Sequence, residues 1–326
     1  MTTLDLRCTT QTRLLGEHPG GSAGGADRYL LVTLPLPWPA DIGDHPLLAG
    51  LGDVDGPLPV GRTRLLGVTP ALTDGAPTVA DGVELVVHDR PAGSAHYTRW
   101  SGRAAPVDLA AAVAAIRAGD LGGLRRDDDP PIEVLVCAHG SRDRCCGSAG
   151  TRLALDLAAE TDTDSDADGE PDGPRPLRVQ RASHLGGHRF APTALLFPVG
   201  LGLAHVDAGH VRALAHRRVH PAEVERHVRG WLGLADPVTQ RADVAALSAL
   251  GWGWWEQARL ATVTGDDEPV VTLSRDDGTV VTVQLRGTEA FPVPVCGQTL
   301  DAATKEAAGF DVVSIDVSAG GGDPAA

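Results

Sequence analysis

Three of the five cysteines of this 326-residue chain lie within ten residues, directly after a short and mostly apolar run. The run at 132–136 is typical of a central strand of a parallel sheet, and Cys137, Cys145 and Cys146 follow it. Strand ends in open α/β sheets border the crevices in which ligands bind. The segment therefore predicts an α/β fold with a metal or redox site at the end of one strand.

The expected local structure favours thiolates. A helix is expected to begin just after Cys146, and the N–H groups and positive potential of a helix N-terminus lower the pKa of nearby thiols. The other cysteines, Cys8 and Cys296, are isolated in sequence, and we predict that they are buried thiols that bind nothing. Five cysteines are too few for a disulfide framework in a chain of this length, and their number is odd.

A second segment supplies imidazoles. His184 and His188 are four residues apart across a Gly-Gly pair that disfavours a continuous helix, so a loop can direct both rings toward one point. Two thiolates and two imidazoles form a complete set of four ligands, which suits either zinc or an iron-sulfur cluster. The residues alone leave the choice between zinc and a cluster open.

Together the two segments are similar to a known family. They read Cys-x-His-Gly-x-Arg-Asp-x-Cys-Cys at 137–146 and His-x-Gly-Gly-His-x-Phe-Ala-Pro-Thr at 184–193, and both closely resemble the sucrase/ferredoxin-like (sucraseferredoxin-like) family. The resemblance is strong over 131–233 and weaker over 14–100. It implies a thioredoxin-like ferredoxin domain that carries a [2Fe-2S] cluster of the non-Rieske, bis-histidinyl type.

By the same resemblance, the cluster ligands are Cys137, Cys146, His184 and His188, and Cys145 is a close rival of Cys146. The family pattern implies that the histidines share one iron and the thiolates share the other. Because imidazoles are neutral where thiolates are anionic, it also implies a reduction potential well above the roughly −400 mV of plant-type ferredoxins.

Three of the polar residues between the predicted thiolate ligands are candidates for a supporting role. We expect His139, Arg142 and Asp143 to support the site through hydrogen bonds or a local ion pair, because four ligands are supplied without them. These residues are therefore predicted to orient the ligands rather than to bind the metal.

The order strand, helix, strand, hairpin, helix is expected twice, over 28–119 and over 131–233. This order predicts a degenerate thioredoxin-like domain at 1–125 and the ferredoxin domain at 126–235. Residues 236–326 are predicted to form a helix and a small β-rich extension with a disordered tail.

Periodicity and turn residues give the expected elements. The predicted strands are 29–34, 63–68, 83–88, 95–100, 132–136, 177–181, 193–198, 201–206, 270–274 and 279–285. The predicted helices are 107–118, 149–160, 221–232 and 241–250. The acidic stretch 161–173 lacks large apolar residues and is predicted to be a mobile surface insertion.

Charge and hydropathy limit the partners. The formal net charge of −15 is opposite to that of a nucleic-acid binder. No apolar run reaches the ~18 residues of a membrane span, and the N-terminus lacks the pattern of a secretory leader. We therefore expect a cytoplasmic electron carrier, without a classical substrate, whose unidentified partner is another redox protein.

Two alternative functions remain at this point. The same four side chains could hold a structural zinc ion in a binding module. The beginning of the cysteine segment also looks like the opening of a sirohydrochlorin chelatase, in which His139 would bind the inserted metal. The chelatase interpretation leaves the paired cysteines and the two spaced histidines unexplained.

Overall fold

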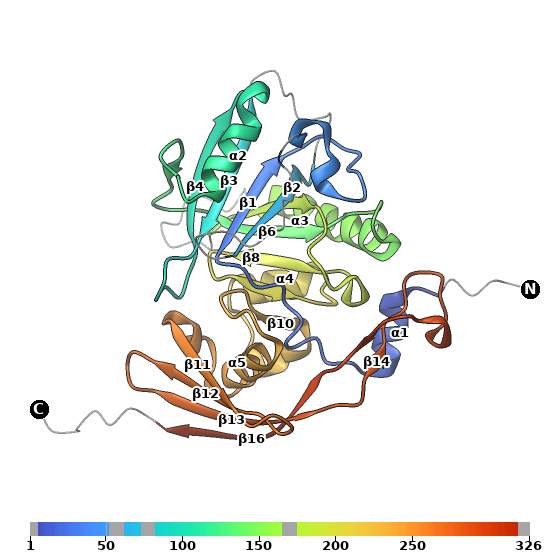
Figure 1. Cartoon of the computed structure of the whole chain (residues 1–326), viewed down its shortest axis with the longest axis vertical. Helices are drawn as coiled ribbons and strands as arrows, with labels where there is room; N and C mark the ends of the chain where they lie inside the picture. The colour runs from blue at the N-terminus through green and yellow to red at the C-terminus, as the bar shows by residue number, and fades with distance from the viewer. Residues whose placement is uncertain (1–5, 50, 52–61, 73–81, 165–174, 319–326) are drawn as a thin grey trace, which may run out of the picture.

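The structure, a computed structural model, describes residues 6–49, 51, 62–72, 82–164 and 175–318. Its main feature is a ten-stranded mixed sheet with the order β10-β9-β8-β6-β7-β2-β1-β3-β4-β5 (Figure 1). The strands are β1 (Arg28–Thr33), β2 (Thr63–Pro70), β3 (Val83–Asp89), β4 (Thr98–Ala104), β5 (Arg125–Arg126), β6 (Ile132–Cys137), β7 (Leu177–Ala182), β8 (Ala194–Phe197), β9 (Leu201–Leu203) and β10 (Val228–Trp231).

The two halves of this sheet are paired in the same way. Strand β1 runs parallel to β2 and antiparallel to β3, and β3 pairs antiparallel with β4. Strand β6 likewise runs parallel to β7 and antiparallel to β8, and β8 pairs antiparallel with β9. The halves meet at an antiparallel β2–β7 pair, with Val68 opposite Ala182. The sheet is therefore continuous, and Cys137 ends a strand in its interior.

In the described part of the chain, five α-helices accompany the sheets. They are α1 (Cys8–Leu15), α2 (Leu109–Arg117), α3 (Thr151–Asp164), α4 (Ala208–Ala215) and α5 (Pro237–Leu250). Apolar residues of α2 pack with those of β1, β2 and β3, whereas α3 and α4 pack with β6, β8 and β9. Because its faces are covered in this way, β6 is buried almost along its whole length.

A second sheet lies beside α5. It contains β11 (Arg259–Thr264), β12 (Val270–Arg275), β13 (Val280–Gly287) and β16 (Phe310–Ser318), and a small separate pair joins β14 (Phe291–Pro292) to β15 (Glu306–Ala307). Helix α5 contacts β10 on one side and β12, β13 and β16 on the other. It thus packs between the two larger sheets, as Figure 1 shows.

Local sequence signals explain how α5 and its surroundings form. The Asp236 carboxylate accepts the N–H of Val238 at 2.9 Å, and a proline occupies the first helical position. Two tryptophans that follow the helix are interior side chains: Trp254 and Trp255 are buried, and the Trp254 indole N–H donates to Asp243 at 2.8 Å.

The predicted mixed α/β class and most of the predicted strands are confirmed, and the strands predicted at 270–274 and 279–285 pair as the β12–β13 hairpin. The helix predicted at 221–232 is wrong. That segment forms two short 3₁₀ turns, Pro221–Glu223 and Glu225–His227, followed by β10. The apolar residues at the end of this segment lie in a strand instead, because Trp231 pairs with Leu201. Gly230 has a φ of +142°, which is not compatible with a helix.

Other boundaries also differ from the prediction. The helix predicted at 149–160 begins at Thr151, after a π-helical turn, and α4 was not predicted. The first residues of the predicted acidic insertion, up to Asp164, belong to α3. The rest of that insertion lies outside the described residues, as does the predicted disordered tail after Ser318. Within the described part of the chain, no helix has both the length and the apolar character needed to cross a membrane.

Candidate metal centre

The cysteine loop begins where β6 ends, and close backbone packing fixes its position. After Cys137 the chain turns and returns as a π-helical turn, Cys146–Gly150. A Cβ placed on Gly150 would lie 1.8 Å from the carbonyl oxygen of Cys137, so only glycine allows this approach. The turn therefore lies directly against the strand end, which brings the two ends of the loop together.

Asp143 orients the two adjacent cysteines. Its Oδ1 atom accepts the backbone N–H of Cys145 at 2.8 Å and that of Cys146 at 3.2 Å. The thiols of these neighbours then belong to different groups: Cys146 interacts with Cys137, whereas Cys145 contacts Cys8 and Cys296. The structure thus separates the two residues that the sequence left as rivals, and it places Cys146 beside Cys137.

Cys137 occupies an environment that favours its thiolate. The Cys146 thiol lowers the pKa of Cys137 well below the usual range, and His184 and the N–H groups of Leu185 and His139 add to this effect against burial. Conversely, its interaction with Cys137 and its burial raise the pKa of Cys146. Both side chains are buried, so the pair forms a protected place for a thiophilic group.

His184 lies beside this thiol pair. It is held in the loop after β7, where Gly186 and Gly187 have φ of +78° and +67°. Among the described residues, its buried Nδ1 atom has no hydrogen-bond partner. A buried, unpaired imidazole nitrogen next to two cysteines is chemically suited to bind a metal.

His139 holds the loops in place. Its Nδ1 atom accepts the backbone N–H of His184 at 3.0 Å, and its Nε2 atom lies 2.7 Å from the carbonyl oxygen of Pro39, to which it donates. Burial lowers the pKa of His139, which favours the neutral ring that this pattern requires. Both ring nitrogens are therefore engaged, and neither faces a metal in this arrangement.

The Arg142 guanidinium contacts the chain that follows β1. It is exposed and lies 3.3 Å from the carbonyl oxygen of Ala40, while the neighbouring Ser141 hydroxyl donates to Trp38 at 2.6 Å. These bonds fasten the cysteine loop to the first half of the sheet. The Arg142 side chain thus holds the loop against the backbone at Ala40.

His188 lies on the other side of Asp143. Its Nδ1 atom is 3.3 Å from Oδ2 of Asp143 and 3.4 Å from the Cys8 sulfur. Within the described residues, no hydrogen bond or ion pair connects it to Cys137 or Cys146. The structure therefore brings together three of the four predicted ligands, and it places His188 against a second group of side chains.

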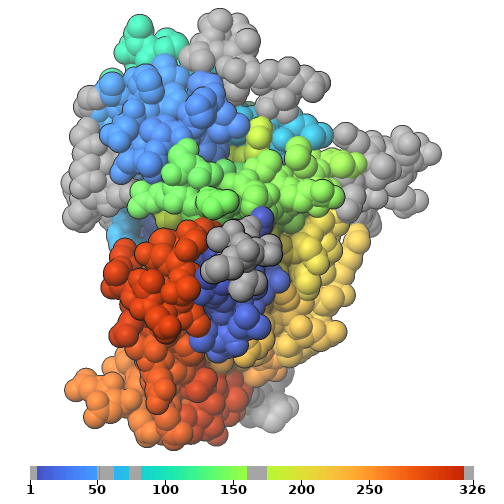
Figure 2. All heavy atoms as spheres, turned by 90° about the vertical axis from the view of Figure 1, so that its right-hand side faces the viewer, coloured from blue at the N-terminus to red at the C-terminus, as the bar shows by residue number. Residues whose placement is uncertain are grey.

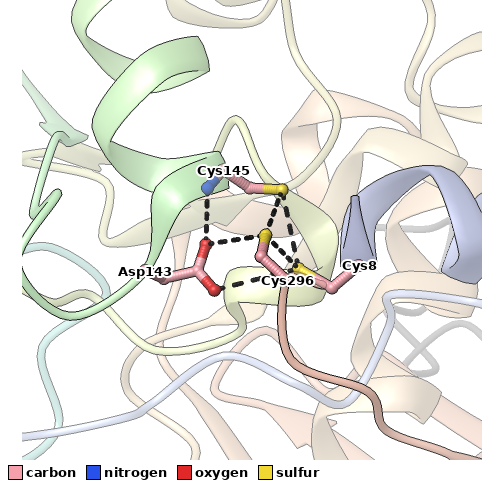
Figure 3. Close-up of side chains that lie close together, drawn as sticks. All are labelled: Cys8, Asp143, Cys145 and Cys296. Atoms are coloured by element: carbon pink, nitrogen blue, oxygen red, sulfur yellow. Dashed lines mark hydrogen bonds between the residues drawn. The ribbon is translucent and has the colours of Figure 1, made fainter. Parts of the chain in front are cut away.

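That second group contains Cys8, Asp143, Cys145 and Cys296, whose potential ligand atoms all lie within 4.8 Å of one another (Figure 3). The Cys8 sulfur is 3.6 Å from each of the other two sulfurs, which are 2.9 Å apart. Cys8 begins α1, and Cys296 lies in the loop between β14 and β15. Sequence reasoning did not find this group, because its members are far apart along the chain.

Charge in this group is concentrated on one thiol. Hydrogen bonds from Cys8 and Cys296 lower the pKa of Cys145 to about 6 against burial. The interaction with Cys145 raises the pKa of Cys8, and burial raises that of Cys296. Burial opposes ionisation of Asp143, but His188 and the two cysteine N–H groups lower its pKa overall. The group thus pairs a thiolate with a carboxylate at a largely buried place.

Separate contacts hold the two terminal segments at this place. The Gly297 N–H donates to the carbonyl oxygen of Leu6 at 3.0 Å, and the Gln11 amide donates to Gln298 at 2.9 Å. The Thr9 hydroxyl donates to Ala191 at 2.6 Å. Figure 2 shows the dark blue N-terminal helix beside the orange C-terminal segment, below the green region that contains the cysteine loop.

Comparison with known proteins gives one family match, to the central part of the chain. No curated protein and no solved structure matches the chain. The family described as Sucrase/ferredoxin-like matches residues 72–230, a stretch that includes the four predicted ligands but neither Cys8 nor Cys296. This match confirms the resemblance drawn from the cysteine and histidine motifs. Residues 72–230 of the chain thus match the sucrase/ferredoxin-like family.

Proposed function

We propose that this protein transfers electrons through a [2Fe-2S] cluster held by Cys137, Cys146, His184 and His188. The observation that carries the proposal is the buried Cys137–Cys146 pair beside the unpartnered Nδ1 atom of His184. A family description that includes ferredoxins is in keeping with it. When bound, such a cluster supplies a one-electron redox couple.

The side chains present fit this ligand set. Two cysteines supply the thiolates, and one imidazole nitrogen beside them has no other partner. His188 approaches Asp143 through Nδ1, which leaves Nε2 for a metal; ligating histidines commonly make such a bond to a carboxylate through their other nitrogen. In this proposal Asp143 fixes both a histidine ligand and the turn that carries Cys146.

The finer description of the fold belongs to the same proposal. The parallel β6–α3–β7 unit is followed by the β8–β9 hairpin, with the order β7-β6-β8-β9, which is the arrangement expected of a thioredoxin-like domain. Strands β1 to β4 repeat this pairing pattern. We infer two thioredoxin-like halves, of which only the second carries cluster ligands, and a C-terminal β-rich extension.

The partner proposed for this site is another redox protein. His184 and His188 are both partly exposed, so the histidine side of the site lies nearer to solvent than the buried cysteines. A docking partner would therefore approach this side. We also propose a cytoplasmic location.

Spectroscopy and metal analysis on the anaerobically purified full chain test the cluster. About two irons and two sulfides per chain, visible absorption bands and an EPR signal after reduction are expected. Cys137→Ser should lose the iron, and His188→Cys should retain it with a shifted EPR signal. His210→Ala is the matched control, because this histidine pairs with Asp207 outside the site and the variant should keep the wild-type spectrum.

Other results would overturn the proposal. A colourless protein with one zinc held by the same four side chains would identify a structural site instead. Iron that persists in Cys137→Ser would place the cluster elsewhere. The chelatase alternative is disfavoured by His139, both of whose ring nitrogens are engaged within the protein.

A further inference from the structure

The group formed by Cys8, Asp143, Cys145 and Cys296 supplies no ligand to the proposed cluster. Its members come from three separate segments: the start of α1, the cysteine loop after β6, and the loop between β14 and β15. Cys8, Asp143 and Cys145 are buried, and Cys296 is partly buried. Three thiols and a carboxylate that converge from distant parts of a chain need a reason to lie together.

The separations within the group resemble the edges of a metal-centred tetrahedron. A zinc ion with bonds of about 2.3 Å to sulfur and about 2.0 Å to oxygen holds its ligand atoms roughly 3.5–3.8 Å apart. The Cys8 sulfur is 3.6 Å from both other sulfurs and 3.9 Å from Oδ2 of Asp143. The Cys296 sulfur also lies against this carboxylate, 3.9 Å from its other oxygen, Oδ1.

One edge is shorter than zinc would require. The sulfurs of Cys145 and Cys296 are 2.9 Å apart, so one of them must move outward by somewhat less than 1 Å. Cys296 can make this movement, because it lies in a loop between two short strands and is only partly buried. The other members are fixed by α1 and by the hydrogen bonds of Asp143 to the cysteine loop.

We propose that Cys8, Cys145, Cys296 and Asp143 bind one Zn²⁺ ion, at a site distinct from the cluster. Three soft thiolates and one oxygen ligand suit zinc, which accepts both donor types in a closed tetrahedral shell. Oδ2 of Asp143 is the available ligand atom, because Oδ1 already accepts two backbone N–H groups. The Nδ1 atom of His188 lies 3.3 Å from Oδ2 and can orient the carboxylate by a hydrogen bond.

The two proposed sites use different sulfurs. Cys137 and Cys146 belong to the cluster, and Cys145 belongs to the zinc site although it is next to Cys146 in sequence. Zinc would tie both terminal segments to the cysteine loop, where they already meet through the hydrogen bond between Gly297 and Leu6. The zinc proposal therefore rests on sulfurs of its own and does not depend on the cluster, although Asp143 supports both sites.

Metal analysis of the reduced full chain tests the zinc site. The protein is purified anaerobically with a phosphine reductant, supplied with Zn²⁺, freed of loose metal, and analysed for zinc, iron and sulfide together. One zinc per chain is expected. Cys8→Ser and Cys296→Ser should each lower the zinc at least tenfold in competition with a chromophoric chelator, and both should keep their iron. Cys137→Ser is the matched control and should lose iron while it keeps zinc.

Thiol mapping tests the site without any variant. In the zinc-loaded wild type, Cys8, Cys145 and Cys296 should resist alkylation and become reactive when a chelator removes the zinc. The proposal is overturned if the reduced chain binds no zinc, if zinc leaves with Cys137→Ser rather than with Cys296→Ser, or if Cys8→Ser removes the iron. Protection that a chelator does not relieve, with a Cys145–Cys296 disulfide in the mass spectrum, would also overturn it.

Discussion

A buried carboxylate in the sheet should make the stability of this protein depend steeply on acid pH. Glu133 lies in β6 with its side chain fully buried. Its carboxylate is 2.9 Å from Nε2 of His88 and 3.2 Å from Nε of Arg99, and Arg178 lies 3.7 Å away on the other side. Burial opposes the charge, but these partners outweigh it and lower the pKa of Glu133 to about 2.

The size of the effect follows from that pKa. A carboxyl group that titrates near 4.5 in the unfolded chain and near 2 in the folded protein stabilises the fold on the order of 3 kcal/mol at neutral pH. Because the folded pKa is the lower one, this stabilisation is complete above about pH 5. It is lost as the pH falls through the folded value near 2.

Urea denaturation of wild type and Glu133→Gln measures this contribution. The variant should be less stable by about 3 kcal/mol at pH 7, because it leaves Arg99 and Arg178 without their shared buried anion. The difference between the two proteins should shrink by about 2 kcal/mol between pH 6 and pH 3. Glu306→Gln, at an exposed position, is the control and should show no such change.

Two outcomes would refute this reasoning. One is a stability difference below about 1 kcal/mol at pH 7, which would mean that the ion pairs only offset the cost of burial. The other is a difference that stays constant down to pH 3, which would mean that folding does not lower the pKa of Glu133.

Two further substitutions test how the site and the C-terminal region are built. Gly150→Ala places a methyl group 1.8 Å from the backbone oxygen of Cys137. We expect the free energy of unfolding to fall by about 1–3 kcal/mol and the iron content to fall as well, both measured on purified protein. Gly253→Ala is the control, because its added methyl group meets no neighbouring atom. Asp243→Ala should destabilise the protein by about 3–5 kcal/mol in thermal or urea denaturation, because it leaves the Arg259 guanidinium buried without its anion. An unchanged midpoint in either case would contradict the packing described.

Much of the fold could be predicted because its signals are local. Apolar runs bounded by turn residues predicted strands such as β1 and β6. The same signals predicted β12 and β13, which pair as a hairpin. The helix predicted at 221–232 failed for a physical reason. Its spacing suits a helix locally, but pairing with β9, more than 20 residues away, converts its end into β10.

The site was predictable only in part, for a related reason. Cys137, Cys146 and His184 lie in recognisable motifs, and the structure brings them together. The choice between Cys145 and Cys146 depends on a turn fixed by Asp143, which spacing along the chain does not reveal. The contact between Cys8 and Cys296 joins residues 288 positions apart, and no local pattern indicates such a pair.

The meeting of Cys8 with Cys296 also sets an order of events during synthesis. The cysteine loop and the histidine loop are complete once the ribosome has passed residue 188, whereas the three-thiol group needs more than a hundred further residues. Non-local contacts form only after the intervening chain exists. Cys8 and Cys145 are therefore without Cys296 on the nascent chain for some time after the cysteine loop and the histidine loop have been synthesised.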